Sequence, residues 1–262
     1  MAESTLPKGS LVLVTGATGY VATHIIQTFL SLGYHVRGTV RDVEKASWLT
    51  NSLFATYAAS GSFTLSHVPT LADPHAFDAA VKGVSAIVHV ASVVTFDADP
   101  NKVIPPTVLG ATAILSAAMR EPSVKEFVFT SSIVAAAMPV PGNAVRVTHD
   151  TFNEMAIQLA WAPEKEGEGN GGVVYMASKA AAEKAIWEFV AQNSPSFNVN
   201  TVAPGTVIGM PLHESHLSSA GHWLKPLFDG KQEEGGLPYS ESFSLLFLPF
   251  VSFFVFFFFL FL

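Results

Sequence analysis

The feature that most constrains this chain is a glycine-rich turn near its N-terminus, between a strand-like run and a helix-like run. Ser10–Thr15 is a short β-branched run, and Tyr20–Leu32 has apolar residues at helical spacing. Gly16 and Gly19 allow the backbone to approach a ligand closely, and Ala22 is small enough for the helix to pack on the strand. Because N–H groups at the start of a helix attract phosphate, the pattern predicts a dinucleotide-binding α/β unit. The alternative is a plain turn in which a glycine caps the helix.

The rest of the chain alternates between strand-like and helix-like runs. Residues 132–175 interrupt the pattern and read as an irregular surface excursion that is rich in proline, glycine and acidic residues. Regular alternation is typical of a parallel sheet whose strands are joined by crossover helices. The sequence therefore predicts an α/β fold, a doubly wound parallel sheet of the Rossmann type. The expected strands are 10–15, 35–40, 62–67, 86–90, 127–130 and 198–202, and the expected helices are 20–32, 43–57, 74–81, 103–119 and 176–192.

Composition excludes several classes of protein. Charged residues make up 13% of the chain, hydrophobic residues 49%, and the formal net charge is −7. A chain this apolar is not intrinsically disordered, and an acidic chain is a poor match for nucleic acid, so we expect no nucleic-acid partner. The absence of cysteine excludes disulfides, thiolate metal sites and cysteine nucleophiles. The N-terminus lacks the basic and apolar regions of a secretory signal, which predicts a cytoplasmic protein.

A tyrosine and a lysine lie four residues apart where the last long predicted helix begins. Tyr175 and Lys179 therefore share one face of that helix. A phenol has a pKa of about 10 and transfers protons poorly at neutral pH unless a nearby cation stabilises the phenolate. Two serines, Ser131 and Ser132, follow the fifth predicted strand at the carboxyl edge of the sheet, where such folds bind ligands. A serine hydroxyl there could hold a carbonyl oxygen close to the phenol.

The end of the second predicted strand carries the residues that choose between two dinucleotides. An acidic residue at this point usually accepts the ribose 2′-hydroxyl of NAD. Here Arg41 comes first and Lys45 follows, and both cations suit a 2′-phosphate. We therefore expect NADPH or NADP⁺ as the coenzyme. In the alternative interpretation Asp42 holds the ribose, and the coenzyme is NAD.

Several long motifs occur in a consistent order along the chain. From Ser10 to about Leu237 the sequence resembles the extended short-chain dehydrogenases/reductases, with an NAD-dependent epimerase/dehydratase-type domain. Within them it is most similar to the branch of dihydroflavonol 4-reductases and fungal NADPH-dependent aldehyde and ketone reductases. The motifs that carry the resemblance are TGATGYVA, TVRDVEK, HAFDAAVKGVSAIVHVAS, VIPPTVLGATAIL, KEFVFTSS, HDTFNE, VYMASKAAAEKA and NTVAPGTVIG.

The resemblance implies a reaction and a set of residues. NADPH would deliver a hydride to the carbonyl carbon of a small molecule, Tyr175 would give the proton, Lys179 would lower the pKa of the phenol, and Ser132 would orient the carbonyl. Ser132 is preferred to Ser131 because the family's serine is the last of this hydroxyl run. The implied coenzyme-binding residues are Gly16, Thr18, Gly19, Tyr20, Val21, Arg41, Lys45, Leu71, Ala91, Ser92, Tyr175, Lys179, Pro204 and Val207.

The chain departs from the family pattern at two positions and in its last part. Thr70 stands where the family usually has an aspartate, and Val93 where it has a proline. Members continue well beyond this chain with a portion that closes the substrate pocket, so we expect a C-terminally truncated substrate-binding portion. The predicted organisation is an N-terminal extension at 1–9, a dinucleotide-binding domain at 10–210, a partial substrate-binding region at 211–242 and an apolar tail at 243–262.

The tail, FSLLFLPFVSFFVFFFFLFL, is long enough to cross a bilayer as a helix. It contains Pro249, and no Lys/Arg cluster precedes it. Its residues can all be written with T-rich codons, which favours an artefact of the gene model such as a translated intron. A membrane anchor and a buried terminal element are the alternatives. A membrane partner is expected only if this tail is an anchor.

Two further functions stay open beside carbonyl reduction. One is a dehydratase/epimerase or hydroxysteroid dehydrogenase that uses the same Ser–Tyr–Lys set. The other is a truncated, catalytically silent NADP-binding module. His89 lies on a predicted buried strand and reads as a core histidine. His213, His216 and His222 lack convincing ligand spacing, so we predict no metal site.

Overall fold

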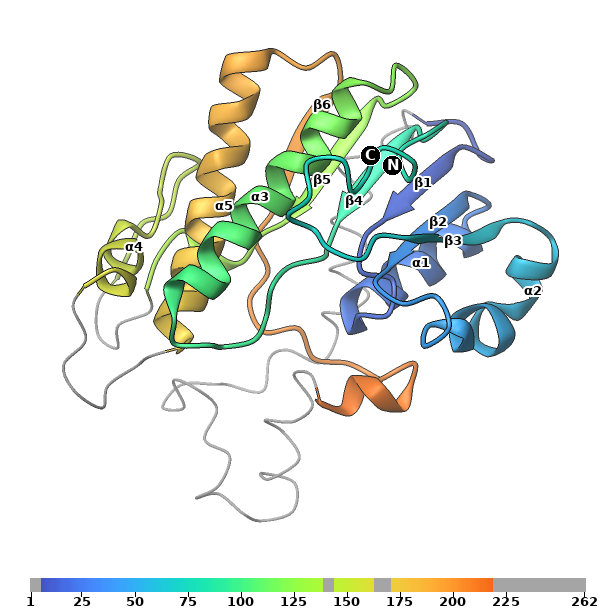
Figure 1. Ribbon diagram of the computed structural model, residues 1–262, viewed down its shortest axis with the longest axis horizontal. Coiled ribbons are helices and arrows are strands. Elements are labelled where there is room, and N and C mark those ends of the chain that lie inside the picture. The colour runs from blue at the N-terminus through green and yellow to red at the C-terminus, as the bar shows by residue number, and fades with distance from the viewer. Residues whose placement is uncertain (1–5, 139–143, 163–170, 219–262) are drawn as a thin grey trace.

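The computed structural model describes residues 6–138, 144–162 and 171–218, which form a single parallel sheet with helices on both faces (Figure 1). The strand order is β3-β2-β1-β4-β5-β6, and every neighbouring pair is parallel. This is the order of a doubly wound dinucleotide-binding fold, so the predicted fold class is confirmed. The strands are β1 Leu11–Val14, β2 His35–Val40, β3 Phe63–His67, β4 Ala86–His89, β5 Glu126–Thr130 and β6 Asn198–Val202.

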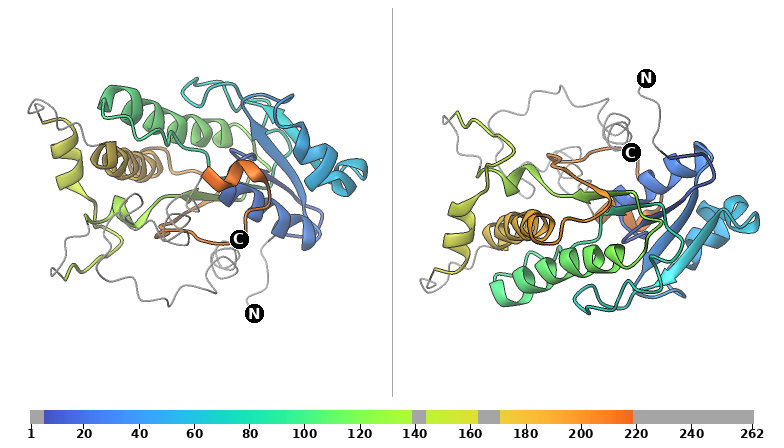
Figure 2. Two further views of the ribbon diagram at one scale, coloured as in Figure 1. Left: turned by 90° about the horizontal axis from the view of Figure 1, so that it is seen from below. Right: turned by 90° about the horizontal axis from the view of Figure 1, so that it is seen from above.

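Two hydrophobic layers sandwich the sheet because successive strand residues point to opposite faces. Val12 and Val14 pack beneath α1 (Tyr20–Ser31), together with the π-helical turn Leu49–Leu53. Leu13 points to the opposite layer. There α3 (Pro100–Met119) and α5 (Gly171–Asn193) lie side by side (Figure 2), and α4 (Glu154–Ala160) packs on α5. The short helix α2 (Ala55–Ala59) follows the π-helical turn.

Three local predictions differ from the structure. The helix expected at 74–81 is wrong: this segment is a series of turns, in which the Asp73 carboxylate accepts from the His75 N–H and the Ala76 N–H donates to the Asp73 carbonyl. The helix expected at 43–57 is interrupted, and only its second half is helical, as the π-helical turn and α2. The stretch expected to be irregular contains α4 and the first residues of α5.

The start of α5 is fixed by a close approach to the loop after β4. A Cβ on Gly171 would lie 1.9 Å from the backbone oxygen of Phe96, so only glycine fits at this position. Phe96 itself has a φ of 51°, in the left-handed region that non-glycine residues rarely adopt. Its ring lies against the ring of Tyr175, with 5.2 Å between the centroids. The loop thus places an aromatic side chain beside the tyrosine that the sequence singles out.

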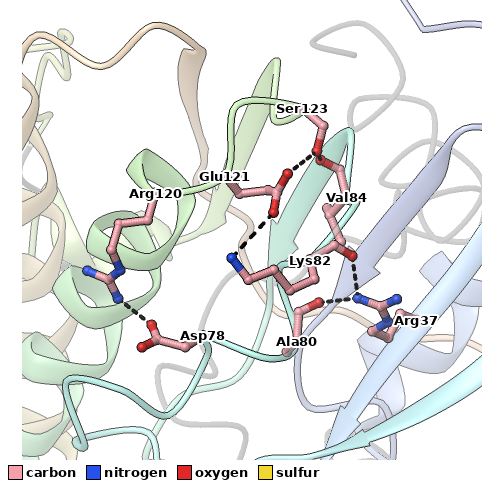
Figure 3. A network of polar contacts seen from close by, with 8 residues as sticks. All are labelled: Arg37, Asp78, Ala80, Lys82, Val84, Arg120, Glu121 and Ser123. Atoms are coloured by element: carbon pink, nitrogen blue, oxygen red, sulfur yellow. Dashed lines mark hydrogen bonds and ion pairs between the residues drawn. The ribbon is translucent and has the colours of Figure 1, made fainter.

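The segments that lead into β4 and β5 are joined by polar contacts, at the opposite end of the sheet from the glycine-rich turn (Figure 3). The Arg37 guanidinium donates to the carbonyls of Ala80 and Lys82 at 2.7 and 2.8 Å. Ser123 donates to the carbonyl of Val84 at 2.8 Å, which ties the two segments together. The same region contains the ion pairs Lys82–Glu121 and Arg120–Asp78. These contacts stabilise the end of the sheet where the strands begin, whereas the candidate site lies at the carboxyl edge.

The predicted terminal regions are described only in part. Leu6, in the expected extension 1–9, is buried in the core beneath α1. The region 211–242 is described to residue 218, and the tail 243–262 lies outside the described residues. Among the described helices, one is long and apolar enough to cross a membrane, Pro100–Met119, and 56% of its apolar window is buried inside the protein.

Candidate active site

The glycine-rich turn leaves the start of α1 without a capping side chain. Gly16 has a φ of 68°, and a Cβ there would lie 3.2 Å from both Cα and Cβ of Ala91. Gly19 is the N-cap of α1, and no side chain accepts from the first turn. The N–H groups of Tyr20 and Val21 have no acceptor inside the helix because they belong to its first turn. This end of α1 can therefore receive a phosphate group.

Thr15 and His89 tie this turn to the loop after β4. The hydroxyl of Thr15 accepts from the backbone N–H groups of Val90 and Ala91, at 3.0 and 2.9 Å. The Thr15 hydroxyl can then donate its proton to Nδ1 of His89, 2.9 Å away. This nitrogen is therefore the acceptor, and the imidazole is neutral. Burial, with a smaller contribution from the charge of Lys179, lowers the pKa of His89 to about 3. The predicted core position of His89 is confirmed, with a side chain only 2% exposed.

The residues expected to contact the adenosine part of the coenzyme lie in loops at the carboxyl edge of the sheet. Arg41 is exposed directly after β2, and its carbonyl accepts from His67 at 3.1 Å. The Asp42 carboxylate accepts from the backbone N–H of Lys45 at 3.1 Å, which is the largest cause of its lowered pKa. Leu71 lies against α3, where a Cβ on Gly110 would come within 2.9 Å of it.

Tyr175 and Ser132 come together between α5 and the end of β5. The Ser132 side chain lies beside the phenol, close enough to influence its pKa by hydrogen bonding. Burial raises the pKa of Tyr175 above its ordinary value of 10.0, and the contact with Ser132 partly opposes that rise. Next to Ser132, the N–H of Ile133 donates to the carbonyl of Pro204 at 2.9 Å, so the segment after β6 lies beside the serine.

Lys179 reaches the end of β5 one helical turn further along α5. Its side chain is buried, and Nζ donates to the Thr130 carbonyl at 3.2 Å. Burial lowers the pKa of this ammonium to about 8, while the carboxylate of Glu183 acts in the opposite direction. The two neighbouring serines diverge: Ser132 meets Tyr175, whereas Ser131 donates to Glu183.

Sequence reasoning missed a set of histidine contacts that joins the segment after β6 to the glycine-rich turn, to α1 and to Trp48. The short 3₁₀ helix Glu214–Ser218 places His216 with Nε2 3.2 Å from the carbonyl of Thr18. His213 stacks on Trp48 with 3.8 Å between the ring centroids. His24, on α1, has its Nε2 2.9 Å from the carbonyl of Met210. Nothing in the spacing of these residues indicates that they meet.

Pro204 and Val207 lie in the same segment and are half-buried. Among residues 6–138, 144–162 and 171–218, no group of three or more His, Asp or Glu side chains is arranged to hold a metal ion.

Buried polar atoms without partners gather at this edge of the sheet. Within the described ranges, four buried side-chain atoms lack a hydrogen-bond partner: Tyr20 Oη, Ser92 Oγ, Thr130 Oγ1 and His216 Nδ1. They belong to the first turn of α1, the loop after β4, the end of β5 and the segment over the glycine-rich turn. Buried polar groups are normally satisfied. Their position therefore fits a bound dinucleotide that supplies the missing partners.

The comparisons with known proteins identify the family. The model of the 3-beta hydroxysteroid dehydrogenase/isomerase family matches residues 13–203, which is more than half of the chain. The chain belongs to this family. The match and the relatives below confirm the resemblance to extended short-chain reductases on which the sequence analysis relied.

The relatives are reductases and epimerase/dehydratase-type proteins. An NAD-dependent epimerase/dehydratase of Aspergillus terreus is 42% identical over 235 residues, which cover 90% of this chain and 69% of the relative. Aldehyde reductase 2 of Sporidiobolus salmonicolor is 37% identical, over 87% of this chain and 67% of its own length. The structure of yeast methylglyoxal/isovaleraldehyde reductase complexed with NADPH has a TM-score of 0.69 at 26% identity, covering 84% of this chain and 66% of that one. The chain thus spans about two thirds of the length of its relatives.

Proposed function

We propose that this chain binds NADPH and reduces the carbonyl group of a small aldehyde or ketone to an alcohol. The observation that carries the proposal is the convergence of Ser132, Tyr175 and Lys179 at the end of β5, at the edge that also holds the uncapped start of α1. The relatives named aldehyde reductase and ketoreductase support the same reaction class.

Three side chains have separate roles in the proposed reaction. NADPH, when bound, supplies the hydride that reduces the carbonyl carbon. Ser132 holds the carbonyl oxygen beside the phenol, and Tyr175 donates its proton to that oxygen as the alcohol forms. Because burial raises the pKa of Tyr175, the cationic side chain of Lys179 is needed to stabilise the phenolate that remains.

The coenzyme-binding residues would lie along the carboxyl edge of the sheet. The first turn of α1 would hold the pyrophosphate, Ala91 and Ser92 in the loop after β4 would contact the coenzyme, and Pro204 and Val207 would lie beside the nicotinamide. Ser92 Oγ is buried without a partner and is thus available to the coenzyme.

The loop after β2 supports a proposed preference for NADPH over NADH. The Asp42 carboxylate is already engaged by the backbone N–H and the ammonium of Lys45, at 3.1 and 3.7 Å. These contacts occupy part of the acceptor capacity of the carboxylate. Arg41 is exposed beside it and can bind a 2′-phosphate. The solved relative complexed with NADPH supports this choice.

Two other functions keep specific support. The family name favours a hydroxysteroid dehydrogenase, and the relative from Aspergillus terreus favours an epimerase/dehydratase-type reaction with the same three side chains.

The test is the consumption of NADPH by the purified chain across a panel of aldehydes, ketones, 3-ketosteroids and their alcohols. NADH is run in parallel, and coenzyme binding is measured separately by the change in NADPH fluorescence. Reduction of an aldehyde or ketone with a preference for NADPH supports the proposal. Turnover of a steroid alone favours the hydroxysteroid alternative. Binding of NADPH without turnover of any compound means that the chain is a silent module.

A further inference from the structure

Glu183 lies one helical turn after Lys179 on α5 and is held by two strands. Its Oε2 accepts from the hydroxyl of Ser131 at the end of β5. Its Oε1 accepts from the hydroxyl of Thr201 on β6, at 3.0 Å. Each carboxylate oxygen is thus fixed by a hydroxyl from a different strand, in a partly buried position behind the candidate active site.

Lys179 is a buried cation with few compensating contacts. Its Nζ donates to one backbone carbonyl, at Thr130, and lies 5.6 Å from the centroid of the Phe129 ring. An isolated ammonium in such a place tends to lose its proton because burial penalises the charged form. A carboxylate four residues away on the same helix opposes that loss through its charge.

The other ionisable groups near Lys179 do not replace this carboxylate. His89, on β4, is neutral because its Nδ1 is the acceptor of the Thr15 hydroxyl. Tyr175, on α5, is a protonated phenol at neutral pH because burial raises its pKa. On α4, Glu154 is paired with Lys184 at 2.5 Å.

We propose that Glu183 is a positioning residue that keeps the buried ammonium of Lys179 charged, and that Ser131 and Thr201 serve to hold its carboxylate in place. Its relevance to catalysis rests on the proposed function, in which a cationic Lys179 stabilises the phenolate of Tyr175. This assigns Ser131 a role distinct from that of Ser132, although the two are adjacent in sequence. It also explains why a buried serine at the end of β5 points away from the candidate active site.

The experiment is an NMR titration of the Lys179 side chain in protein with ¹³C-labelled lysine, assigned by its loss in Lys179→Met. The chemical shift of the methylene next to the ammonium reports the charge directly, without substrate or coenzyme. Glu183→Gln removes the charge and keeps the size and one accepting oxygen. Glu183→Asp keeps the charge and shortens the reach to the two hydroxyls. Glu188→Gln, at an exposed position on the same helix, is the matched control.

The proposal predicts that Glu183→Gln lowers the pKa of Lys179 by about one unit or more, as expected for the loss of a nearby opposite charge. Glu183→Asp should lower it by less than about half as much, and Glu188→Gln should leave it unchanged. The opposite order, with an unchanged pKa in Glu183→Gln and a large fall in Glu183→Asp, would mean that the carboxyl group is only a hydrogen-bonding spacer. If Glu183→Gln does not fold, folded Glu183→Asp decides: a pKa close to that of the wild type supports the proposal, and a fall of a full unit overturns it.

The two proposals can fail separately. Where turnover is found, Glu183→Gln should move the alkaline limb of the pH–rate profile to lower pH, because Lys179 then loses its proton earlier as pH rises. If no carbonyl compound is reduced but the NMR shift occurs, the proposed function fails and the role of Glu183 stands. If turnover occurs and the pKa of Lys179 is the same in Glu183→Gln as in the wild type, the role of Glu183 fails alone.

Discussion

The buried imidazole of His89 predicts a specific dependence of stability on pH. His89 accepts a hydrogen bond from Thr15 and is enclosed by aromatic rings, including that of Phe129 stacked at 5.9 Å. Protonation would break the bond at Nδ1 and place a second charge near Lys179. The pKa of His89 is accordingly lowered from 6.5 to about 3. The perturbations are a fall in pH from 7 to 5 and the variant His89→Asn, whose amide can still reach Thr15.

The sign and the magnitude follow from the two pKa values. Between pH 6.5 and 3 the unfolded chain binds a proton at this position and the folded protein does not, so the free energy of unfolding falls as the pH falls. With the pKa at about 3 in the folded state, His89 alone lowers the free energy of unfolding by about 2 kcal/mol between pH 7 and pH 5. Above pH 6.5 the titration of His89 no longer lowers the free energy of unfolding.

The assay is urea unfolding of the wild type and His89→Asn at pH 7, 6 and 5. His24 and His216 also have lowered pKa values, but they contribute equally to both proteins. The wild type should therefore lose about 2 kcal/mol more than His89→Asn over this range. An equal pH dependence in the two proteins would refute a neutral, buried His89. The absolute stability of His89→Asn does not decide the question, because the smaller side chain also leaves space in the core.

Three further predictions concern the coenzyme and the reaction. Gly38→Ala should lower the free energy of unfolding by about 1–3 kcal/mol and weaken NADPH binding. The reason is that the new Cβ would lie 2.6 Å from the Cβ of Ala17 in the glycine-rich turn. Thermal unfolding measures the first effect, and fluorescence titration with NADPH measures the second. Arg41→Ala should weaken NADPH binding about tenfold or more and leave NADH binding nearly unchanged, in parallel titrations of both coenzymes. Ser132→Ala should lower kcat by about a hundredfold or more. Ser131→Ala should have a much smaller effect near pH 7, and equal losses in the two serine variants would contradict their separate roles.

The parallel sheet could be predicted from the sequence because its strands are short β-branched runs with strong local patterns. The helix predicted at 74–81 is wrong because the contacts that fix this segment are not those of a helix. The carboxylate of Asp73 turns the chain at its start, and Asp78 is engaged by His75 and Arg120. Arg120 comes from the end of α3, forty-two positions later, and no local pattern announces such a contact.

In the candidate site, too, the local contacts could be predicted from the sequence and the long-range contacts could not. Tyr175 and Lys179 could be placed together because an (i, i+4) spacing on a helix fixes their relative position. Glu183 lies at the next such position, yet its role depends on Ser131 and Thr201, which come from two strands. The stacking of His213 on Trp48 brings together a loop after β2 and the segment after β6. Contacts of this kind depend on tertiary packing and leave no periodic signal in the sequence.

The central claim, that Tyr175 donates the proton in an NADPH-dependent carbonyl reduction, is tested most directly by comparing the wild type with Tyr175→Phe. Both proteins are assayed for NADPH consumption with the best carbonyl compound of the panel, and for NADPH binding by fluorescence. The account predicts that Tyr175→Phe binds NADPH with nearly the affinity of the wild type and loses turnover by about a hundredfold to ten-thousandfold. Turnover in Tyr175→Phe close to that of the wild type would contradict it.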